Sequence, residues 1–302
     1  MRIFLTTFAD RILRNMSMTI SELIASFKCE GIEEQARFDI ESVIEKELKL
    51  QYTAQNIKDC IACMDYTTLT PKDTEESVKA FVESLYTKTA RLDVKPAAIC
   101  VFPNYASVVK SGLEESGVAT AVVAAGFPAS QTFLELKKSE CKMAIQTGAE
   151  EVDIVIPVGK MLAMQYDEVY QELVTLREVC SGVKLKVILE TGELNDSELI
   201  FKAALIAIHA GADFIKTSTG KVTVNATPEA VYAMALAIKA YYEKFGKKVG
   251  IKVAGGVSTT VTAIKYRTIV SHILGEEWIT PEYFRIGTSK LLDDAIRSLN
   301  AL

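Results

Sequence analysis

From about residue 55 onward, short apolar segments alternate with longer amphipathic segments in a regular order. Several of the short segments are apolar at nearly every position, which is typical of parallel strands covered on both faces. Capping residues and helical periodicity predict helices over residues 74–88, 106–116 and 196–210, and a further one that begins at Thr227-Pro228. The expected strands are residues 61–66, 97–102, 120–125, 151–156, 184–190, 213–217, 249–254 and 284–286.

Eight strand–helix pairs in about 240 residues predict a closed (β/α)8 barrel, the TIM barrel of the α/β class. Two similar turns, at residues 147–150 and 210–213, support this repetition because each ends a helix and leads into a strand. An open, doubly wound sheet is the alternative. It is less favoured because no glycine-rich dinucleotide turn follows the first strand.

Residues 1–50 follow a different pattern and are expected to form an N-terminal helical extension on a barrel domain of residues 51–302. Two amphipathic helices separated near Gly31 would explain the apolar spacing. The apolar residues at helical spacing are Ile20, Leu23, Ile24, Phe27, Ile40, Val43, Ile44 and Leu48.

The first residues carry a weak targeting signal. Charges at Asp10, Arg11 and Arg14 interrupt any signal-peptide core, although the arginine content resembles an organellar transit sequence. The apolar runs fall short of the ~18 residues that a membrane span needs. A soluble cytoplasmic protein without membrane association is therefore expected.

Composition narrows the classes of partner and cofactor. With 34 basic and 39 acidic residues the net charge is −5, so a broad basic surface for nucleic acid is not expected. The six cysteines show no disulfide framework, which indicates reduced thiols. Cys60 and Cys63 could form a redox dithiol, but they lie in an apolar run rather than at a helix start. The only histidines are His209, expected to pack near a helix end, and His272, so no metal site is predicted.

Charged residues lie at the C-terminal ends of the predicted strands, where barrel enzymes place their active sites. A charge in an apolar strand costs several kcal/mol if it is desolvated and unpaired, so each must be paired, neutralised or exposed to a wet site. A structural ion-pair network is the alternative to catalysis. Two ammonium groups in one dry pocket disfavour each other's protonation, which yields a nucleophilic amine that condenses with carbonyls. The charged residues are Asp65, Asp153, Glu190, Lys216 and Lys252.

Small residues after the last three strands predict an anion site. Residues 218–221 (Ser-Thr-Gly-Lys), Gly255-Gly256 and residues 287–289 (Gly-Thr-Ser) let backbone N–H groups approach a ligand. Barrels often hold a phosphate in their last two βα loops. A phosphorylated small molecule is therefore the expected ligand.

These segments resemble the deoxyribose-phosphate aldolases, which are class I, Schiff-base-forming lyases. The likeness runs from about residue 55 to 296 and is most specific in FIKTSTGK and KVAGGV, which contain Lys216 and Lys252. It implies reversible cleavage of 2-deoxy-D-ribose 5-phosphate to acetaldehyde and D-glyceraldehyde 3-phosphate in deoxyribonucleoside catabolism, without metal or cofactor. It also implies a homodimer or homotetramer. The other matching segments are residues 64–70, 97–103, 150–157 and 186–194.

The resemblance assigns roles by motif position. Lys216 would form the Schiff base, Lys252 would keep the pKa of Lys216 low, and Asp153 would relay protons through a water with Asp65 in support. Cys100 and Thr219 would lie at the pocket. The phosphate would be held by Gly220, Lys221, Gly255, Gly256, Gly287 and Ser289.

Three features depart from the family pattern. Lys290 stands where a second serine is common, the family's C-terminal tyrosine has no match in Ala301-Leu302, and the first 50 residues have no counterpart. Two other functions stay open at this point: a Schiff-base lyase for another phosphosugar, and a non-catalytic phosphosugar-binding barrel. Both lysines and Asp153 argue against the second, because binding alone does not need an amine of lowered pKa.

Overall fold

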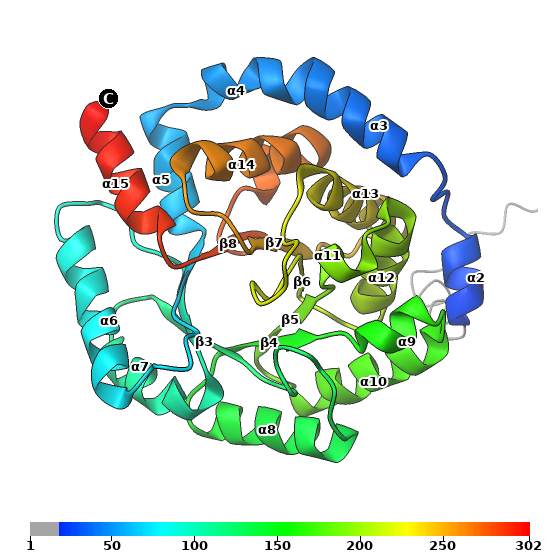
Figure 1. Cartoon of the computed structure of the whole chain (residues 1–302), viewed down its shortest axis with the longest axis horizontal. Helices are drawn as coiled ribbons and strands as arrows, with labels where there is room; N and C mark the ends of the chain where they lie inside the picture. Colours follow the sequence, from blue (N-terminus) through cyan, green and yellow to red (C-terminus); the bar gives the residue numbers. More distant parts are fainter. Residues whose placement is uncertain (1–17) are drawn as a thin grey trace, which may run out of the picture.

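The structure, a computed structural model, describes residues 18–302. In these residues eight parallel strands pair in sequence order, and the eighth strand pairs with the first to close a barrel (Figure 1). The predicted (β/α)8 barrel is confirmed. The strands are β1 (Met64–Thr67), β2 (Ala98–Val101), β3 (Ala119–Val123), β4 (Glu151–Val155), β5 (Lys184–Ile188), β6 (Phe214–Lys216), β7 (Gly250–Ala254) and β8 (Phe284–Thr288).

Helices surround the barrel and connect successive strands. Several begin at a side-chain cap, because the Thr74, Asp196, Thr227 and Thr259 side chains each accept a hydrogen bond from the backbone N–H three residues on. Short 3₁₀ turns lie at Pro103–Tyr105 and Glu276–Trp278. The helices are α5 (Ala54–Ala62), α6 (Glu75–Thr89), α7 (Ala106–Gly112), α8 (Leu134–Gln146), α9 (Val158–Leu162), α10 (Tyr166–Val179), α11 (Thr191–Leu194), α12 (Ser197–His209), α13 (Pro228–Phe245), α14 (Thr260–Leu274) and α15 (Leu291–Ala301).

Several expected element boundaries differ from the structure, and two of them are wrong by three residues or more. The first strand was expected at residues 61–66, but Ile61 and Ala62 belong to α5, whose buried face runs directly into the buried strand β1. Because both elements are apolar there, the pattern does not separate them. The helix expected to reach residue 116 ends at Gly112.

The two similar turns have the same structure. Gly148 and Gly211 adopt φ values of +113° and +102°, which favour glycine. The acidic residue that ends each turn accepts a hydrogen bond from a backbone N–H near the start of the neighbouring strand. Glu150 accepts from Thr120 N at 2.9 Å, and Asp213 accepts from Leu185 N at 2.8 Å. The repeated sequence thus starts β4 and β6 in register with the strands before them.

The described part of the N-terminal extension wraps around the outside of the barrel (Figure 1). Its helices contact α12, α13 and α14, and the Tyr232 hydroxyl donates a hydrogen bond to the Asp39 carboxylate. Residue 50, where the extension was expected to end, lies inside α4. The transit-like segment, residues 1–17, falls outside the described residues. The elements are α2 (Ile20–Ala25), α3 (Ile32–Asp39), a π-helical turn (Ile40–Ile44) and α4 (Glu45–Gln51).

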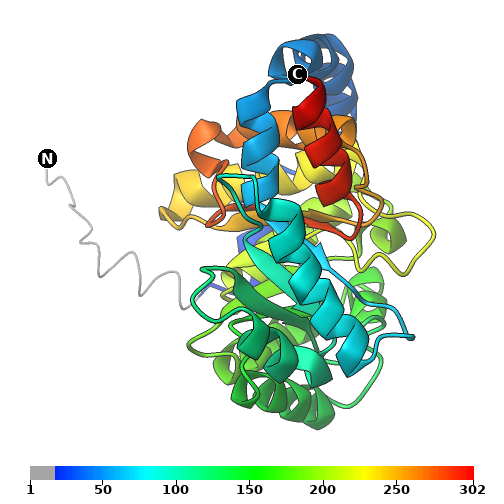
Figure 2. The same ribbon diagram turned by 90° about the vertical axis from the view of Figure 1, so that its left-hand side faces the viewer.

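Helix α5 precedes the barrel and packs beside the last helix, α15, as the side view shows (Figure 2). Cys60 and Cys63 lie at the C-terminal end of α5, both free and buried, and burial raises the pKa of Cys60 to about 12. Such a thiol stays protonated, which argues against a redox dithiol. Between residues 18 and 302, no helix is both long and apolar enough to span a bilayer.

His209 ends α12, as expected. Its Nδ1 lies 3.1 Å from the Tyr241 hydroxyl, and its ring packs against Tyr170 and Phe245. Burial lowers the pKa of His209, with the nearby Lys247 ammonium acting in the same direction. This histidine is a packing residue on the outer layer of the barrel.

Candidate active site

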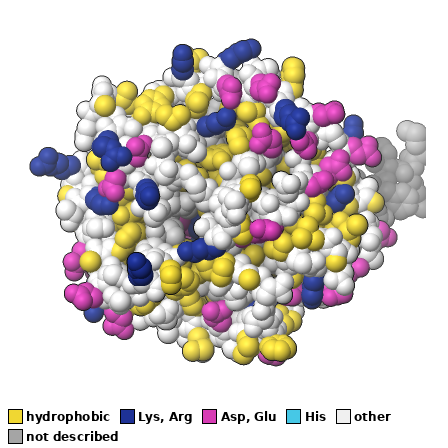
Figure 3. Space-filling view, in the orientation of Figure 1, with side chains coloured by type: hydrophobic (Ala, Val, Ile, Leu, Met, Phe, Trp, Pro, Cys, Tyr) yellow, Lys and Arg dark blue, Asp and Glu magenta, His cyan; other side chains and the backbone are white. Residues whose placement is uncertain are grey.

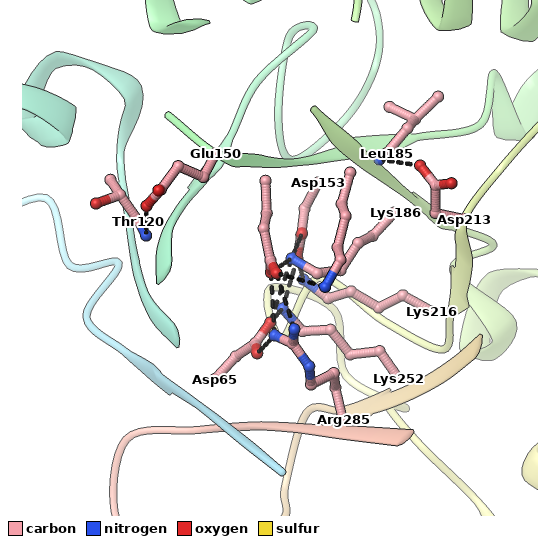
Figure 4. Close-up of polar contacts among 12 residues, drawn as sticks. Asp65, Thr120, Glu150, Asp153, Leu185, Lys186, Asp213, Lys216, Lys252 and Arg285 are labelled. Atoms are coloured by element: carbon pink, nitrogen blue, oxygen red, sulfur yellow. Dashed lines mark hydrogen bonds and ion pairs between the residues drawn. The ribbon is translucent and has the colours of Figure 1, made fainter. Parts of the chain in front are cut away.

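Charged side chains from six strands converge inside the barrel (Figure 4). All of them are nearly or fully buried, and Lys216 is 3% exposed. We refer to this set as the charged cluster; it consists of Asp65 of β1, Glu151 and Asp153 of β4, Lys186 of β5, Lys216 of β6, Lys252 of β7 and Arg285 of β8.

Asp153 is the centre of the charged cluster. Its Oδ1 accepts a hydrogen bond from Lys186 Nζ at 2.9 Å, and its Oδ2 accepts from both Lys216 Nζ and Lys252 Nζ at 2.7 Å. Lys216 and Lys252 lie side by side and point to the same face of the sheet because they are register partners in the β6–β7 ladder. The structure thus brings together the two lysines and the aspartate that the sequence singled out.

A second layer of ion pairs lies beneath Asp153. Arg285 binds both carboxylate oxygens of Glu151, at 2.8 and 3.0 Å, and reaches Asp65 Oδ1 at 2.6 Å. Lys186 lies 2.7 Å from Glu151 Oε2, and Lys252 donates to Asp65. Bidentate pairing of this kind holds a guanidinium and a carboxylate in one geometry. Asp65 therefore joins the two layers.

The sequence interpretation missed Glu151, Lys186 and Arg285. Glu151 precedes Asp153 by two residues, so both side chains point to the same face of β4. Lys186 is the register partner of Asp153 in the β4–β5 ladder. The alternation was visible in the sequence, but the pairing register that places Lys186 and Arg285 beside the aspartates was not.

The electrostatic surroundings distinguish Lys216 from Lys252: they lower the pKa of Lys216 and raise that of Lys252. Burial lowers the pKa of Lys216 and the Lys252 ammonium lowers it further, against the attraction of Asp153. Burial acts on Lys252 as well, but the carboxylates of Asp153 and Asp65 outweigh it and raise the Lys252 pKa. The lysines also hold the pKa of Asp153 well below its usual range despite burial. The expected lowering thus occurs at Lys216 and not at Lys252.

A cavity of about 610 Å³ opens above the charged cluster, and Lys216 is the member of the cluster that lines it. Thr219 and the predicted phosphate-binding residues line it too: Gly220, Lys221, Gly255, Gly256, Gly287 and Ser289. The cavity is not lined by Asp65, Asp153, Lys252 or Cys100. Cys100 lies buried in β2, where burial raises the pKa of its thiol.

The cavity has a positive lining. Besides the Lys216 amine, its ionisable side chains within the part of the chain described are Lys221 and Lys290, with no carboxylate among them. Seen along the barrel, Lys and Arg side chains lie around the centre of this face (Figure 3). Gly287 keeps space for the cluster, because a Cβ at this position would lie 2.9 Å from Ala254 Cβ and 3.2 Å from Lys252 Cε.

The arrangement has the parts that an amine nucleophile, a proton acceptor and an anion site would need. Lys216 offers a desolvated amine to the cavity, Asp153 lies beneath it, and the glycine-rich loops and two further lysines line the same cavity. An amine of lowered pKa forms Schiff bases with carbonyl compounds. Among residues 18–302, no group of His, Cys, Asp and Glu side chains is arranged to hold a metal ion.

Known proteins share both sequence and fold. The DeoC/LacD family aldolase profile matches residues 60–272. Deoxyribose-phosphate aldolases of Mus musculus and Homo sapiens are 38% and 37% identical, covering 84% and 83% of this chain and the same shares of those proteins. The tetrameric deoxyribose phosphate aldolase from Aeropyrum pernix is 25% identical, with a TM-score of 0.66 over 85% of this chain and 98% of that one. The chain therefore belongs to the DeoC/LacD family of aldolases.

Proposed function

We propose that this aldolase is a deoxyribose-phosphate aldolase that reversibly cleaves 2-deoxy-D-ribose 5-phosphate to acetaldehyde and D-glyceraldehyde 3-phosphate. It is a lyase, and we assign it to deoxyribonucleoside catabolism. The observation that carries the assignment is the Lys216 amine, which is desolvated, shares Asp153 Oδ2 with Lys252, and lines a cavity with two further lysines.

Lys216 begins the reaction by attacking C1 of the open-chain sugar. The C1 oxygen leaves as water, and an iminium forms between Lys216 Nζ and C1. Burial and the Lys252 charge favour this step because both increase the fraction of neutral amine at a given pH.

The iminium then accepts the electron pair of the C2–C3 bond. Asp153 takes the C3 hydroxyl proton through a water, the C3–O bond becomes the aldehyde carbonyl, and the released electrons form an enamine on Lys216. D-Glyceraldehyde 3-phosphate leaves, the enamine is protonated at C2, and hydrolysis frees acetaldehyde and the amine. Lys252 stays charged beside Asp153 and stabilises its carboxylate.

The phosphate lies at the other end of the cavity in this proposal. Lys221 supplies a positive charge to it, and backbone N–H groups of the small residues that line the cavity can donate to it. These small residues are Gly220, Gly255, Gly256, Gly287 and Ser289. Binding energy from this remote group positions C1 at Lys216, so that it contributes to the rate as well as to affinity.

We also assign catalysis to residues 51–302, since the whole charged cluster and the cavity lie there. A homodimer or homotetramer is proposed, and the tetrameric Aeropyrum pernix relative supports it. The six free cysteines support a cytoplasmic location. Light scattering of the purified full chain measures the oligomeric state directly.

Borohydride trapping tests the proposed function. Acetaldehyde and sodium borohydride should add one reduced ethyl group to Lys216, detected by mass spectrometry, and the same protein should release acetaldehyde from 2-deoxy-D-ribose 5-phosphate. Lys216→Met should abolish both, whereas Lys265→Met on the outer surface should change neither. A protein that binds the phosphosugar but forms no adduct would be a binding module instead.

A further inference from the structure

Glu190 is a buried acid that the reaction above does not use. It lies two residues beyond β5 and adopts φ +55° and ψ +58°, a left-handed conformation that is uncommon for a residue other than glycine. Such conformations persist only where surrounding contacts compensate for the strain, and they cluster at functional sites. The residue as a whole is 3% exposed.

The Glu190 carboxylate binds one residue of the loop after β6 at two points. Its Oε1 accepts from Thr219 N at 3.1 Å, and its Oε2 accepts from the Thr219 hydroxyl at 2.5 Å. Burial raises the pKa of Glu190, and the two Thr219 hydrogen bonds oppose this by favouring the ionised form.

These contacts fix the direction of the Thr219 hydroxyl. A carboxylate can only accept, so the hydroxyl proton points to Glu190, and a lone pair of the same oxygen accepts from Lys221 N at 3.1 Å. The Lys221 ammonium in turn donates to the Leu69 carbonyl oxygen. Glu190 therefore fixes the backbone conformation of Thr219, Gly220 and Lys221. This segment lines the cavity beside Lys216.

We propose that Glu190 is a positioning residue that orders the β6–α13 loop for the phosphate of the substrate. This inference rests on the proposed function, in which that loop receives a phosphate ester. Glu190 acts through Thr219 and touches no reacting atom. Its loss should weaken capture of the phosphorylated substrate more than it slows the chemistry at Lys216.

Glu190→Gln tests this with little change in shape. A glutamine amide nitrogen facing the Thr219 hydroxyl would donate to it, and the hydroxyl proton would then turn toward the Lys221 N–H. We expect KM for 2-deoxy-D-ribose 5-phosphate to rise about tenfold, with a much smaller change in kcat and in borohydride trapping of acetaldehyde. Glu193→Gln, an exposed glutamate on α11, is the matched control and should change neither.

Thr219→Val is a second, independent variant, and it tests the proposal even if Glu190→Gln fails to fold. It removes the hydroxyl while leaving the carboxylate, so it should raise KM to a similar extent. The double variant should be no worse than either single one, because both changes break the same chain of contacts. Additive effects, or a fall in kcat with unchanged KM, would overturn the proposal.

Failure of the proposed function would look different. The wild-type protein would then release no acetaldehyde at all, whereas Glu190 could still be tested by titration with inorganic phosphate. In that case weaker phosphate binding by Glu190→Gln than by Glu193→Gln supports the positioning role, and equal binding contradicts it.

Discussion

Lys216 Nζ and Lys252 Nζ donate to the same carboxylate oxygen, Asp153 Oδ2, each at 2.7 Å. The two nitrogens are thus at most twice that distance apart, and two positive charges at ~5 Å repel by about 3 kcal/mol at an effective dielectric constant of ~20. Asp65 contacts only Lys252 of the two. The geometry therefore makes Lys252 the lysine that holds its proton more firmly and Lys216 the one that loses it more readily.

The first prediction concerns pH dependence. Because the pKa of Lys216 is lowered, its reactive neutral form is present above that pKa and is lost as pH falls through it. Removing the Lys252 charge takes away a repulsion and leaves Asp153 Oδ2 to Lys216, and both effects raise the Lys216 pKa. In Lys252→Met the acid limb of kcat/KM should move to higher pH by about one to two units.

The measurement is a pH profile of kcat/KM alongside borohydride trapping over the same range. Lys248→Met, which removes a lysine stacked on Trp278 outside the barrel, controls for a general change in net charge. An unmoved or more acidic limb in Lys252→Met would show that Lys252 does not lower the Lys216 pKa.

A second prediction concerns metals. In the proposed reaction the Lys216 iminium accepts the electron pair of the breaking bond, so no Lewis acid is required. Prolonged dialysis against EDTA should leave acetaldehyde release unchanged, and adding Mg²⁺ or Zn²⁺ afterwards should not increase it. A loss of activity that a metal ion restores would contradict the metal-free assignment.

A third prediction concerns Lys290, the residue that departs from the family pattern. It lines the cavity at the start of α15, and it has no ion-pair partner within residues 18–302. An exposed charge of this kind contributes up to about 1 kcal/mol. Lys290→Ser should therefore raise KM for the phosphosugar about threefold to fivefold and flatten its dependence on salt.

Unphosphorylated 2-deoxyribose separates this effect from a change in the reaction itself. Its turnover should be the same in Lys290→Ser and the wild type, and Lys265→Ser should match the wild type with both substrates. Equal KM values for the phosphosugar would place Lys290 in solvent rather than at the phosphate.

The barrel and the positions of Lys216 and Lys252 on neighbouring strands could be predicted because each depends on local sequence. Apolar runs mark the strands, and Lys216 and Lys252 occur in motifs that leave little doubt about their strands. The glycine-rich loops were equally visible, since residues 218–221 and Gly255-Gly256 follow predicted strands directly.

The second layer of the charged cluster could not be predicted in the same way. Glu151, Lys186 and Arg285 meet only because the stagger of the closed barrel brings residues of β4, β5 and β8 to one level. Register is a property of strand pairs, so a single strand does not reveal it. The start of β1 was misplaced for a related reason, because the buried face of α5 and the buried strand form one apolar run.

The last prediction follows from the charge balance of the cluster. Four cations face three carboxylates, so a neutral Lys216 leaves three charges of each sign. Lys216→Met keeps that balance and should fold with a Tm close to the wild type, although it is inactive. Asp153→Asn removes the negative charge that three lysines share and replaces one acceptor oxygen with an NH2 donor, so it should cost about 3 kcal/mol or more because buried cations lose their counter-charge. Its Tm should fall by about 6–12 °C.

Thermal unfolding at one scan rate compares Lys216→Met and Asp153→Asn with the wild type, with Lys265→Met as the surface control. An Asp153→Asn protein as stable as Lys216→Met would mean that the cluster does not need its central carboxylate.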